Sequence, residues 1–417
     1  MTTQEIRQRP TFFYGYIIVL ASLVIVAAAE GALYSFGVFF APLLSEFGWT
    51  RAMTSGALSL SAVVHIPILV VVGRLTDKIG PRLVLSVCGF FLGLGYLLMS
   101  QTRAMWQLYL FYGVIASIGM GFYWVPVISI VPRWFVKKRG LMMAIVTSGV
   151  GVGQLVVPPL ANWLIAVYGW RKSYLIIGGA TMGFIMIAAQ FLRHHPSQMG
   201  QSPYGGNEME KENSVEEVGG LSFREAIHTR HFWMASVLFL SWVFCLSIVM
   251  VHSVVHAIGL GMSPASAANI LAIIGGMGIA GRLAFGRMAD AIGMKPALII
   301  SLALMSIGFL WLLVATEMWM IYLFAAIFGI TYGTVEILQS PIMANLFGLS
   351  SLGALVGLNT AIGAIGFVIG PVLGGYIFDV TGSYQVIFLV CAAMGIVSTI
   401  LSALLPLAGD KGGQTKS

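Results

Sequence analysis

The sequence predicts an all-α membrane protein with twelve transmembrane helices, arranged as two pseudo-symmetric six-helix bundles. The first observation behind this prediction is composition. Hydrophobic residues make up 58% of the 417 residues and charged residues only 9%, with a mean hydropathy of +0.93. Soluble domains carry about 25% charged residues, so most of this chain must face lipid, which excludes a secreted protein, a disordered chain and a cytosolic enzyme. The other two observations are a series of long apolar stretches and an internal repeat.

The apolar stretches are each long enough to cross a bilayer, which takes roughly 20 residues. Polar breaks separate them, and the Gly and Pro residues inside some of them are tolerated in membrane helices. The first stretch is too long for the apolar region of a signal peptide, so we expect no cleavage. The expected helices cover residues 14–40, 51–73, 81–101, 105–131, 140–167, 171–192, 232–258, 266–289, 296–316, 319–346, 353–380 and 384–406.

The distribution of Lys and Arg predicts the orientation of these helices. Of the 22 basic residues, 17 fall on the side that holds both termini, four fall on the other side, and Arg282 lies inside a helix. Cytoplasmic loops carry an excess of Lys and Arg. We therefore expect a multi-pass protein of the cell (cytoplasmic) membrane with both termini in the cytoplasm. The net charge of +7 reports this topology and does not indicate a nucleic-acid partner.

The two halves of the chain repeat each other at a constant offset of 213 residues. The stretch Gly73 to Asp77 meets Gly286 to Asp290, and Pro158 meets Pro371. A repeat of this kind is typical of transporters whose halves rock against each other, although a duplicated membrane protein without transport activity is the alternative. The expected domains are an N-terminal six-helix bundle (1–192), a polar cytoplasmic linker (193–231) and a C-terminal six-helix bundle (232–417).

Two loop sequences resemble a known family. Residues 73–82 read Gly-Arg-Leu-Thr-Asp-Lys-Ile-Gly-Pro-Arg, which resembles the signature between helices 2 and 3 of the major facilitator superfamily, and 286–295 is a weaker copy. The stretch 133–140 before a Gly-rich helix 5, and a single arginine inside helix 8, resemble the monocarboxylate transporter and oxalate–formate antiporter branch. The resemblance covers the whole chain. It implies the fold of that superfamily and a secondary active transporter, not an enzyme.

The repeated signature also has a physical interpretation. Asp77 ends helix 2 on the side where helix 11 begins near Ser351, and a helix N-terminus offers free N–H groups and a partial positive charge. A carboxylate docked there would latch the halves in the outward-open state, and Asp290 would meet the start of helix 5 by pseudo-symmetry. The alternative is that these charges only set the topology. The candidate latch residues are Gly73, Asp77, Arg82, Gly286 and Asp290.

Arg282 is the main candidate for binding substrate. An arginine near the bilayer centre costs at least roughly 2.5–3.5 kcal/mol on insertion scales. Gly278 and Gly286 flank it on one helical face, which indicates a cleft where the guanidinium could bind a carboxylate in bidentate fashion. The alternative is a structural ion pair with Glu336 or Glu30.

Three titratable residues in the apolar helices are candidates for coupling transport to a proton: Glu336, His252 and Glu30. Burial favours the neutral form of a carboxylic acid, so either glutamate could carry a proton, and histidine titrates near neutral pH. The alternative for each is a polar contact between helices. Further substrate-binding candidates are Tyr332, Tyr34, Tyr123 and Asn359, with interior packing as the alternative.

Departures from the branch narrow the expected function. In its oxalate exchangers a lysine in helix 11 partners the helix 8 arginine, whereas residues 353–380 contain no Lys or Arg. In its animal carriers an acid lies four residues before that arginine and a lysine lies in helix 1, whereas Gly278 and approximately Tyr34 occupy those places. The proton relay of the animal carriers therefore cannot be carried over to this chain. One buried positive charge balances one carboxylate, whereas a dianion would leave a charge unpaired, so we expect transport of a small monocarboxylate such as lactate or pyruvate with one proton. Anion exchange of the oxalate–formate type and a non-transporting receptor remain the alternatives.

No cofactor is expected, because neither a phosphate-binding loop nor a dinucleotide-binding fingerprint occurs. The three cysteines (Cys88, Cys245 and Cys391) sit in apolar runs without metal-ligand spacing. The expected partners are a small organic monocarboxylate anion, a proton and the lipid bilayer, with no nucleic acid. We expect a monomer.

Overall fold

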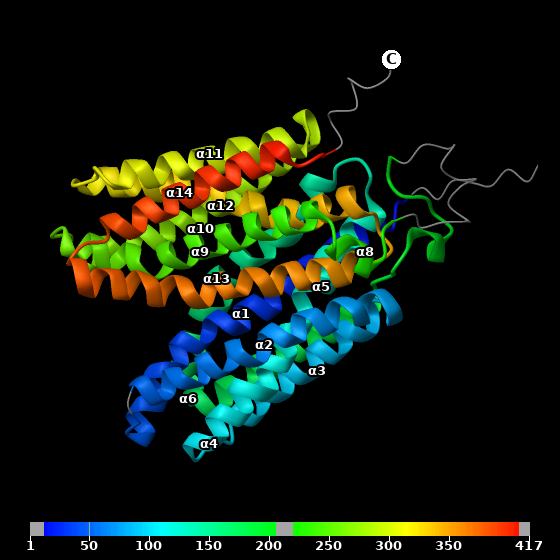
Figure 1. Ribbon diagram of the computed structural model, residues 1–417. Coiled ribbons are helices and arrows are strands. Elements are labelled where there is room, and N and C mark those ends of the chain that lie inside the picture. Colours follow the sequence, from blue (N-terminus) through cyan, green and yellow to red (C-terminus); the bar gives the residue numbers. More distant parts are fainter. Residues whose placement is uncertain (1–11, 50, 206–219, 408–417) are drawn as a thin grey trace, which may run out of the picture.

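The computed structural model describes residues 12–49, 51–205 and 220–407, and these residues form an almost entirely helical protein (Figure 1). The first half contains α1 (Gly15–Phe47), α2 (Arg51–Ile79), α3 (Pro81–Met99), α4 (Met105–Leu108), the π-helix η1 (Tyr109–Ala116), α5 (Ser117–Trp134) and α6 (Arg139–Gln190). The linker contains η2 (Pro196–Met199) and α8 (Phe223–Ile227). The second half contains α9 (Arg230–Gly259), α10 (Pro264–Ile292), α11 (Met294–Leu312), α12 (Met318–Phe347), α13 (Leu352–Thr381) and α14 (Gln385–Leu404).

The described residues include 11 helices that are long and apolar enough to cross a membrane, compared with the twelve expected spans. The difference lies in α6, whose 52 residues contain the expected spans 140–167 and 171–192. A straight helix of that length would measure about 78 Å at 1.5 Å per residue, whereas the hydrocarbon core is about 30 Å thick. Gly169 interrupts α6 with φ 76° and ψ 160°, a conformation that glycine adopts without a steric penalty. α6 therefore supplies two spans.

Several helix boundaries differ from the expectation, and two of the differences are large. α1 continues to Phe47 rather than ending at residue 40, and it ends at Gly48, whose φ of 64° suits the left-handed cap. The segment expected to be a plain linker, 193–231, holds η2, α8 and the first two residues of α9. α8 begins with a capping box in which Ser222 and Glu225 bond to each other's backbone N–H. Part of this segment is therefore ordered structure.

The helices form two bundles, α1 to α6 and α9 to α14 (Figure 1). The bundles meet mainly along two helix pairs, α2 with α13 and α6 with α10. These pairs are equivalent under the 213-residue offset, since α2 corresponds to α10 and α6 to α13. The bundles lie close together at the end that carries α8, which we call the linker face, and they diverge toward the opposite end (Figure 1).

Candidate functional site

Arg282 lies on α10 and is almost fully buried, with 1% of its surface exposed. Its Nε and Nη2 atoms donate hydrogen bonds to Oε2 of Glu336 on α12, at 3.0 and 2.7 Å. Nη2 also donates to the hydroxyl of Tyr332 at 3.0 Å, and the guanidinium carbon lies 4.9 Å from the centre of the Tyr332 ring. Of the two ion-pair partners left open by the sequence, Glu336 is the one in contact. Charge-assisted bonds of this kind are the strong ones in proteins.

Glycines make room for this cluster between α10 and α12. A Cβ atom on Gly278 would come 2.6 Å from the Tyr332 ring, and one on Gly333 would come 2.5 Å from Cγ of Arg282. A Cβ on Gly281 would lie 2.0 Å from the carbonyl oxygen of Ile330. Small residues let membrane helices approach this closely. The helix backbones therefore position the arginine stem and the tyrosine ring side by side.

The N-terminal bundle contributes a second buried carboxylate. Glu30 on α1 is 8% exposed, and its Oε1 accepts a hydrogen bond from the hydroxyl of Tyr123 on α5 at 2.5 Å. Within the described part of the chain, no Lys or Arg pairs with Glu30. It lies within electrostatic range of both Arg282 and Glu336. The Glu30 and Arg282 clusters therefore face each other across the two bundles.

Tyr34 lies one turn beyond Glu30 on α1 and is 47% exposed. Its hydroxyl is hydrogen-bonded to the side chain of Gln154 on α6, and it lies within electrostatic range of Glu30 and Tyr332. A half-exposed side chain that lies near polar groups of both bundles lines the space between them. No sequence pattern had singled out Gln154.

The two repeated aspartates bind helix N-termini of the opposite bundle. Asp77 accepts the backbone N–H groups of Gly353 (3.0 Å) and Ala354 (2.8 Å) at the start of α13. Asp290 accepts those of Gly140 (2.8 Å) and Leu141 (2.9 Å) at the start of α6. Each carboxylate thereby satisfies two N–H groups that have no partner within their own helix.

Paired glycines bring the backbones together next to each aspartate. A Cβ atom on Gly73 would lie 2.2 Å from the carbonyl oxygen of Gly353, and one on Gly286 would lie 2.7 Å from that of Gly140. Any larger residue would push the two helices apart. The contacts at the linker face thus include two equivalent crossings, each with a glycine pair and a carboxylate.

The sequence matches the family model described as Major Facilitator Superfamily over residues 19–293 and 260–416. The chain belongs to this superfamily. Its members are transporters and not enzymes, so the site described above is part of a secondary transporter.

The transporter is similar over most of its length to monocarboxylate transporters. It is 27% identical over 398 residues to Monocarboxylate transporter 13 of Rattus norvegicus, which covers 94% of this chain and 89% of the relative. It is 27% identical over 397 residues to Monocarboxylate transporter 4 of Mus musculus, covering 94% and 83%. The expected branch of the superfamily is therefore confirmed at the level of distant homology.

Solved structures of the superfamily share the fold. FucP, a fucose:proton symporter of Escherichia coli solved in the outward conformation, superimposes with a TM-score of 0.72 at 14% identity, covering 94% of this chain and 98% of FucP. The proton:xylose symporter XylE gives 0.73 at 15% identity, covering 94% and 96%. These likenesses confirm the expected all-helical fold of the transporter.

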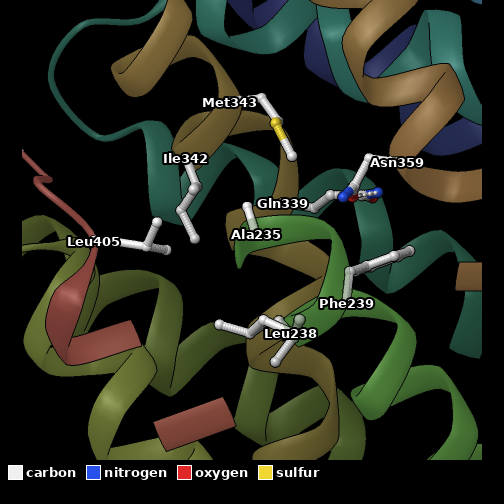
Figure 2. Close-up of a pocket in the computed structure, with 9 residues that line it drawn as sticks. Ala235, Leu238, Phe239, Gln339, Ile342, Met343, Asn359 and Leu405 are labelled. Carbon is white, nitrogen blue, oxygen red and sulfur yellow. Dashed lines mark hydrogen bonds between the residues drawn. The ribbon is translucent and has the colours of Figure 1, made fainter. Parts of the chain in front are cut away.

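Asn359, a predicted substrate residue, is engaged within the C-terminal bundle. Its Oδ1 accepts from Gln339 on α12 at 2.7 Å and its Nδ2 donates to Ser236 on α9 at 3.2 Å. Figure 2 shows this pair at the edge of a small cavity between α9, α12 and α13. The cavity measures about 20 Å³, room for roughly one water molecule. The structure gives Asn359 a helix-packing contact and no contact with Arg282.

His252, a predicted proton carrier, uses both of its ring nitrogens in local contacts. Nδ1 lies 3.2 Å from the hydroxyl of Tyr384, and Nε2 lies 3.0 Å from the carbonyl oxygen of Pro371. A neutral imidazole satisfies both, donating from Nε2 and accepting at Nδ1. His252 therefore joins α9 to α13 and to the residue before α14, apart from the Arg282 cluster.

Arg82, a predicted latch residue, donates from Nε to Oε1 of Gln190 at 2.8 Å, within the N-terminal bundle. The arginine beside Asp77 is instead Arg133 on α5, whose Nη2 lies 2.8 Å from Oδ1. The sequence had marked Arg133 only as part of the branch signature. A basic residue in the short stretch between the expected helices 105–131 and 140–167 was not a sufficient signal for this ion pair.

Proposed function

We propose that this transporter moves a small monocarboxylate of the lactate or pyruvate kind together with one proton, by alternating access. The observation that carries the proposal is Arg282, a buried cation of the C-terminal bundle whose guanidinium already holds the Glu336 carboxylate. The named monocarboxylate transporters among its relatives support the same substrate class.

Substrate binding is an exchange of carboxylates on Arg282. The guanidinium fork matches a carboxylate in geometry and charge. Glu336 takes that position through Oε2, so an incoming substrate carboxylate replaces it. Tyr332 lies next to the same Nη2 atom, and its hydroxyl can donate to the second substrate oxygen.

Proton uptake follows from charge balance. Arg282 and Glu336 together are neutral, and a substrate anion that takes the arginine leaves Glu336 as an unpaired charge. An unpaired buried charge is costly, so the group becomes neutral instead. Glu336 therefore takes up one proton as substrate binds. This coupling is reciprocal, since protonation of Glu336 also frees the arginine for substrate.

Glu30 is the second candidate proton carrier. It is buried without a cationic partner among the described residues, and burial favours a neutral carboxylic acid. When both Glu30 and Glu336 are protonated, Arg282 gives the site a single positive charge. That charge balances a monoanion but not a dianion. Because residues 352–381 contain no Lys or Arg, a dianion would leave a charge unpaired, which disfavours oxalate–formate exchange.

Alternating access requires two domains and a reversible closure between them. The proposed domains are residues 1–192 and 232–417, joined by the linker, with both termini on the cytoplasmic side of the cell membrane as a monomer. The contacts of Asp77 and Asp290 act as the latch that closes the cytoplasmic side. They break when the site opens to the cytoplasm.

The test is uptake of labelled lactate or pyruvate into proteoliposomes under an imposed pH gradient. Glu336→Gln should keep exchange of labelled for unlabelled substrate but lose uphill accumulation, whereas Glu336→Asp should retain both in part. Normal accumulation by Glu336→Gln contradicts its role, and loss of accumulation in Glu30→Gln alone assigns the proton to Glu30.

Two other outcomes would replace the proposal. Uptake that requires an anion inside the vesicles and ignores the pH gradient indicates an exchanger. Binding without movement under any gradient indicates a receptor.

A further inference from the structure

The linker is docked on the N-terminal bundle at its first arm, residues 192–205. The backbone N–H of Tyr204 donates to the carbonyl of Trp134 at 2.9 Å. The N–H groups of Val136 and Lys137 both donate to the carbonyl of Tyr204 at 3.0 Å. These three hydrogen bonds attach the arm to the turn between α5 and α6.

The second arm, residues 220–222, is docked on the C-terminal bundle in an equivalent way. The N–H of Leu221 donates to the carbonyl of Phe347 at 2.9 Å, and the hydroxyl of Ser350 donates to the carbonyl of Leu221 at 3.1 Å. Residues 134–137 become 347–350 under the 213-residue offset. The two arms therefore bind equivalent turns in the two halves of the molecule.

Both turns lead directly into the helix N-termini that receive the latch carboxylates. The first turn enters α6, whose Gly140 and Leu141 bind Asp290, and the second enters α13, whose Gly353 and Ala354 bind Asp77. The shape of each turn decides where those N–H groups point. Holding the turn therefore holds the receiving half of the latch.

Lys138 shows how closely the first turn is constrained. It is the non-glycine residue with positive φ (64°) in the described part of the chain, and it caps α6. A residue with a Cβ adopts this conformation only where its surroundings enforce it. Its ammonium nitrogen lies 5.4 Å from the centre of the Tyr204 ring, so the first arm stabilises this conformation by a cation–π contact.

The second arm also reaches across to the other bundle. Phe223, the first residue of α8, lies under the guanidinium of Arg74 on α2, 4.6 Å from ring centre to Cζ. Arg74 precedes Asp77 by one turn of α2. Since α8 follows the residues bound to Phe347 and Ser350, this contact joins the C-terminal bundle to α2 beside the latch.

We propose that the two linker arms are positioning elements of the latch. They hold the turns that receive Asp77 and Asp290, and Phe223 adds a contact between the bundles that stabilises the state closed at the linker face. The inference rests on the proposed alternating access but not on the identity of the substrate.

The test measures the distance between nitroxide labels at Lys78→Cys and Ile292→Cys, on the linker-face ends of α2 and α10, by pulsed electron resonance. The native cysteines are buried, so labelling is selective. Phe223→Ala should shift the equilibrium between the closed and open states toward the longer distance by about two- to fivefold. This is the effect expected from the loss of one exposed cation–π contact. Phe223→Trp keeps an aromatic face and should leave the distribution unchanged.

A double-mutant cycle separates the contact from general destabilisation. Arg74→Ala and Phe223→Ala should each favour the open state, and the double variant should show no further shift. Tyr204→Ala should shift it in the same direction, and Tyr204→Phe should not. Additive effects of Arg74→Ala and Phe223→Ala, or an unchanged distance in Phe223→Ala, would overturn the proposal.

If Phe223→Ala is not monodisperse, Phe223→Leu is measured instead. The distance between the labels can be measured even if the protein does not transport lactate. Failure of this proposal and failure of the proposed function are therefore distinguishable.

Discussion

At the scale of single residues, Arg282 combines a charge with a defined geometry. Lysine in its place keeps the charge but offers a point contact instead of a planar fork. We expect Arg282→Lys to weaken lactate or pyruvate binding by roughly 10- to 100-fold, the loss of a charge-assisted hydrogen bond. Isothermal titration of the purified transporter measures this. Retained affinity in the lysine variant would argue against bidentate binding.

The matched control for Arg282 removes both charges. Arg282→Ala leaves Glu336 buried without its cation, and breaking such a pair costs about 3–5 kcal/mol. Arg282→Ala combined with Glu336→Gln should recover most of the melting temperature but none of the substrate binding. If the double variant melts as low as the single one, the cost lies in packing around Gly333 instead.

At the scale of helices, the glycine crossings set how closely the bundles approach at the linker face. Gly73→Ala would place a Cβ atom 2.2 Å from the carbonyl oxygen of Gly353, so the helices must separate there. Overpacking of this kind costs typically about 1–3 kcal/mol. We expect the variant to favour the state open at the linker face, measured by the same label pair.

Gly179 on α6 is the matched control for Gly73. A Cβ atom there meets no heavy atom within 4 Å, and alanine is the better helix former. Gly179→Ala should therefore leave the label distance unchanged and the stability equal or slightly higher. A similar shift in both variants would mean that helix propensity, and not the crossing, is being measured.

Another helix-scale contact closes the N-terminal bundle at the end opposite the linker face. Glu46 near the end of α1 accepts hydrogen bonds from Arg171 (2.5 Å) and Trp170 (2.6 Å) just beyond the break in α6. These bonds, Arg171 first, hold the pKa of Glu46 below its ordinary value of 4.5. The contact therefore contributes stability above pH 4.5, and this contribution is lost as the pH falls through the lowered folded-state pKa.

The prediction for Glu46 concerns this pH window. Thermal unfolding of Glu46→Gln should show a smaller decrease in melting temperature below pH 4.5 than the parent protein. The side chain is 40% exposed, so salt should reduce the difference. Identical pH profiles of the two proteins would contradict the assignment.

At the scale of the whole molecule, the 17 basic residues on one side against four on the other predict that the linker face is cytoplasmic. In a bacterial host, a green fluorescent protein fused to the C-terminus should fluoresce, and alkaline phosphatase fused there should be inactive. The opposite pattern would reverse the membrane orientation and place the latch outside.

The fold of this transporter and the docking of Asp77 and Asp290 could be predicted from the amino-acid sequence alone. Apolar length sets the number of spans, because an unpaired backbone cannot cross hydrocarbon. The repeat of Asp77 and Asp290 at the ends of equivalent helices predicted their docking near Ser351 and near Gly140, because helix N-termini attract carboxylates wherever they occur. These features depend on backbone chemistry and spacing, which a sequence displays directly.

Which side chains contact each other could be read only from the assembled helices. Glu336 rather than Glu30 pairs with Arg282 because Gly278 and Gly333 let α10 and α12 approach at that level. His252 and Asn359 turn toward neighbouring helices of their own bundle. A membrane helix that is apolar all round has no polar face to indicate which side packs against its neighbours. The backbone hydrogen bonds of the linker arms likewise leave no pattern of side chains in the sequence. Partner choice follows from helix rotation and close packing, which are properties of the assembled bundles and not of any one segment.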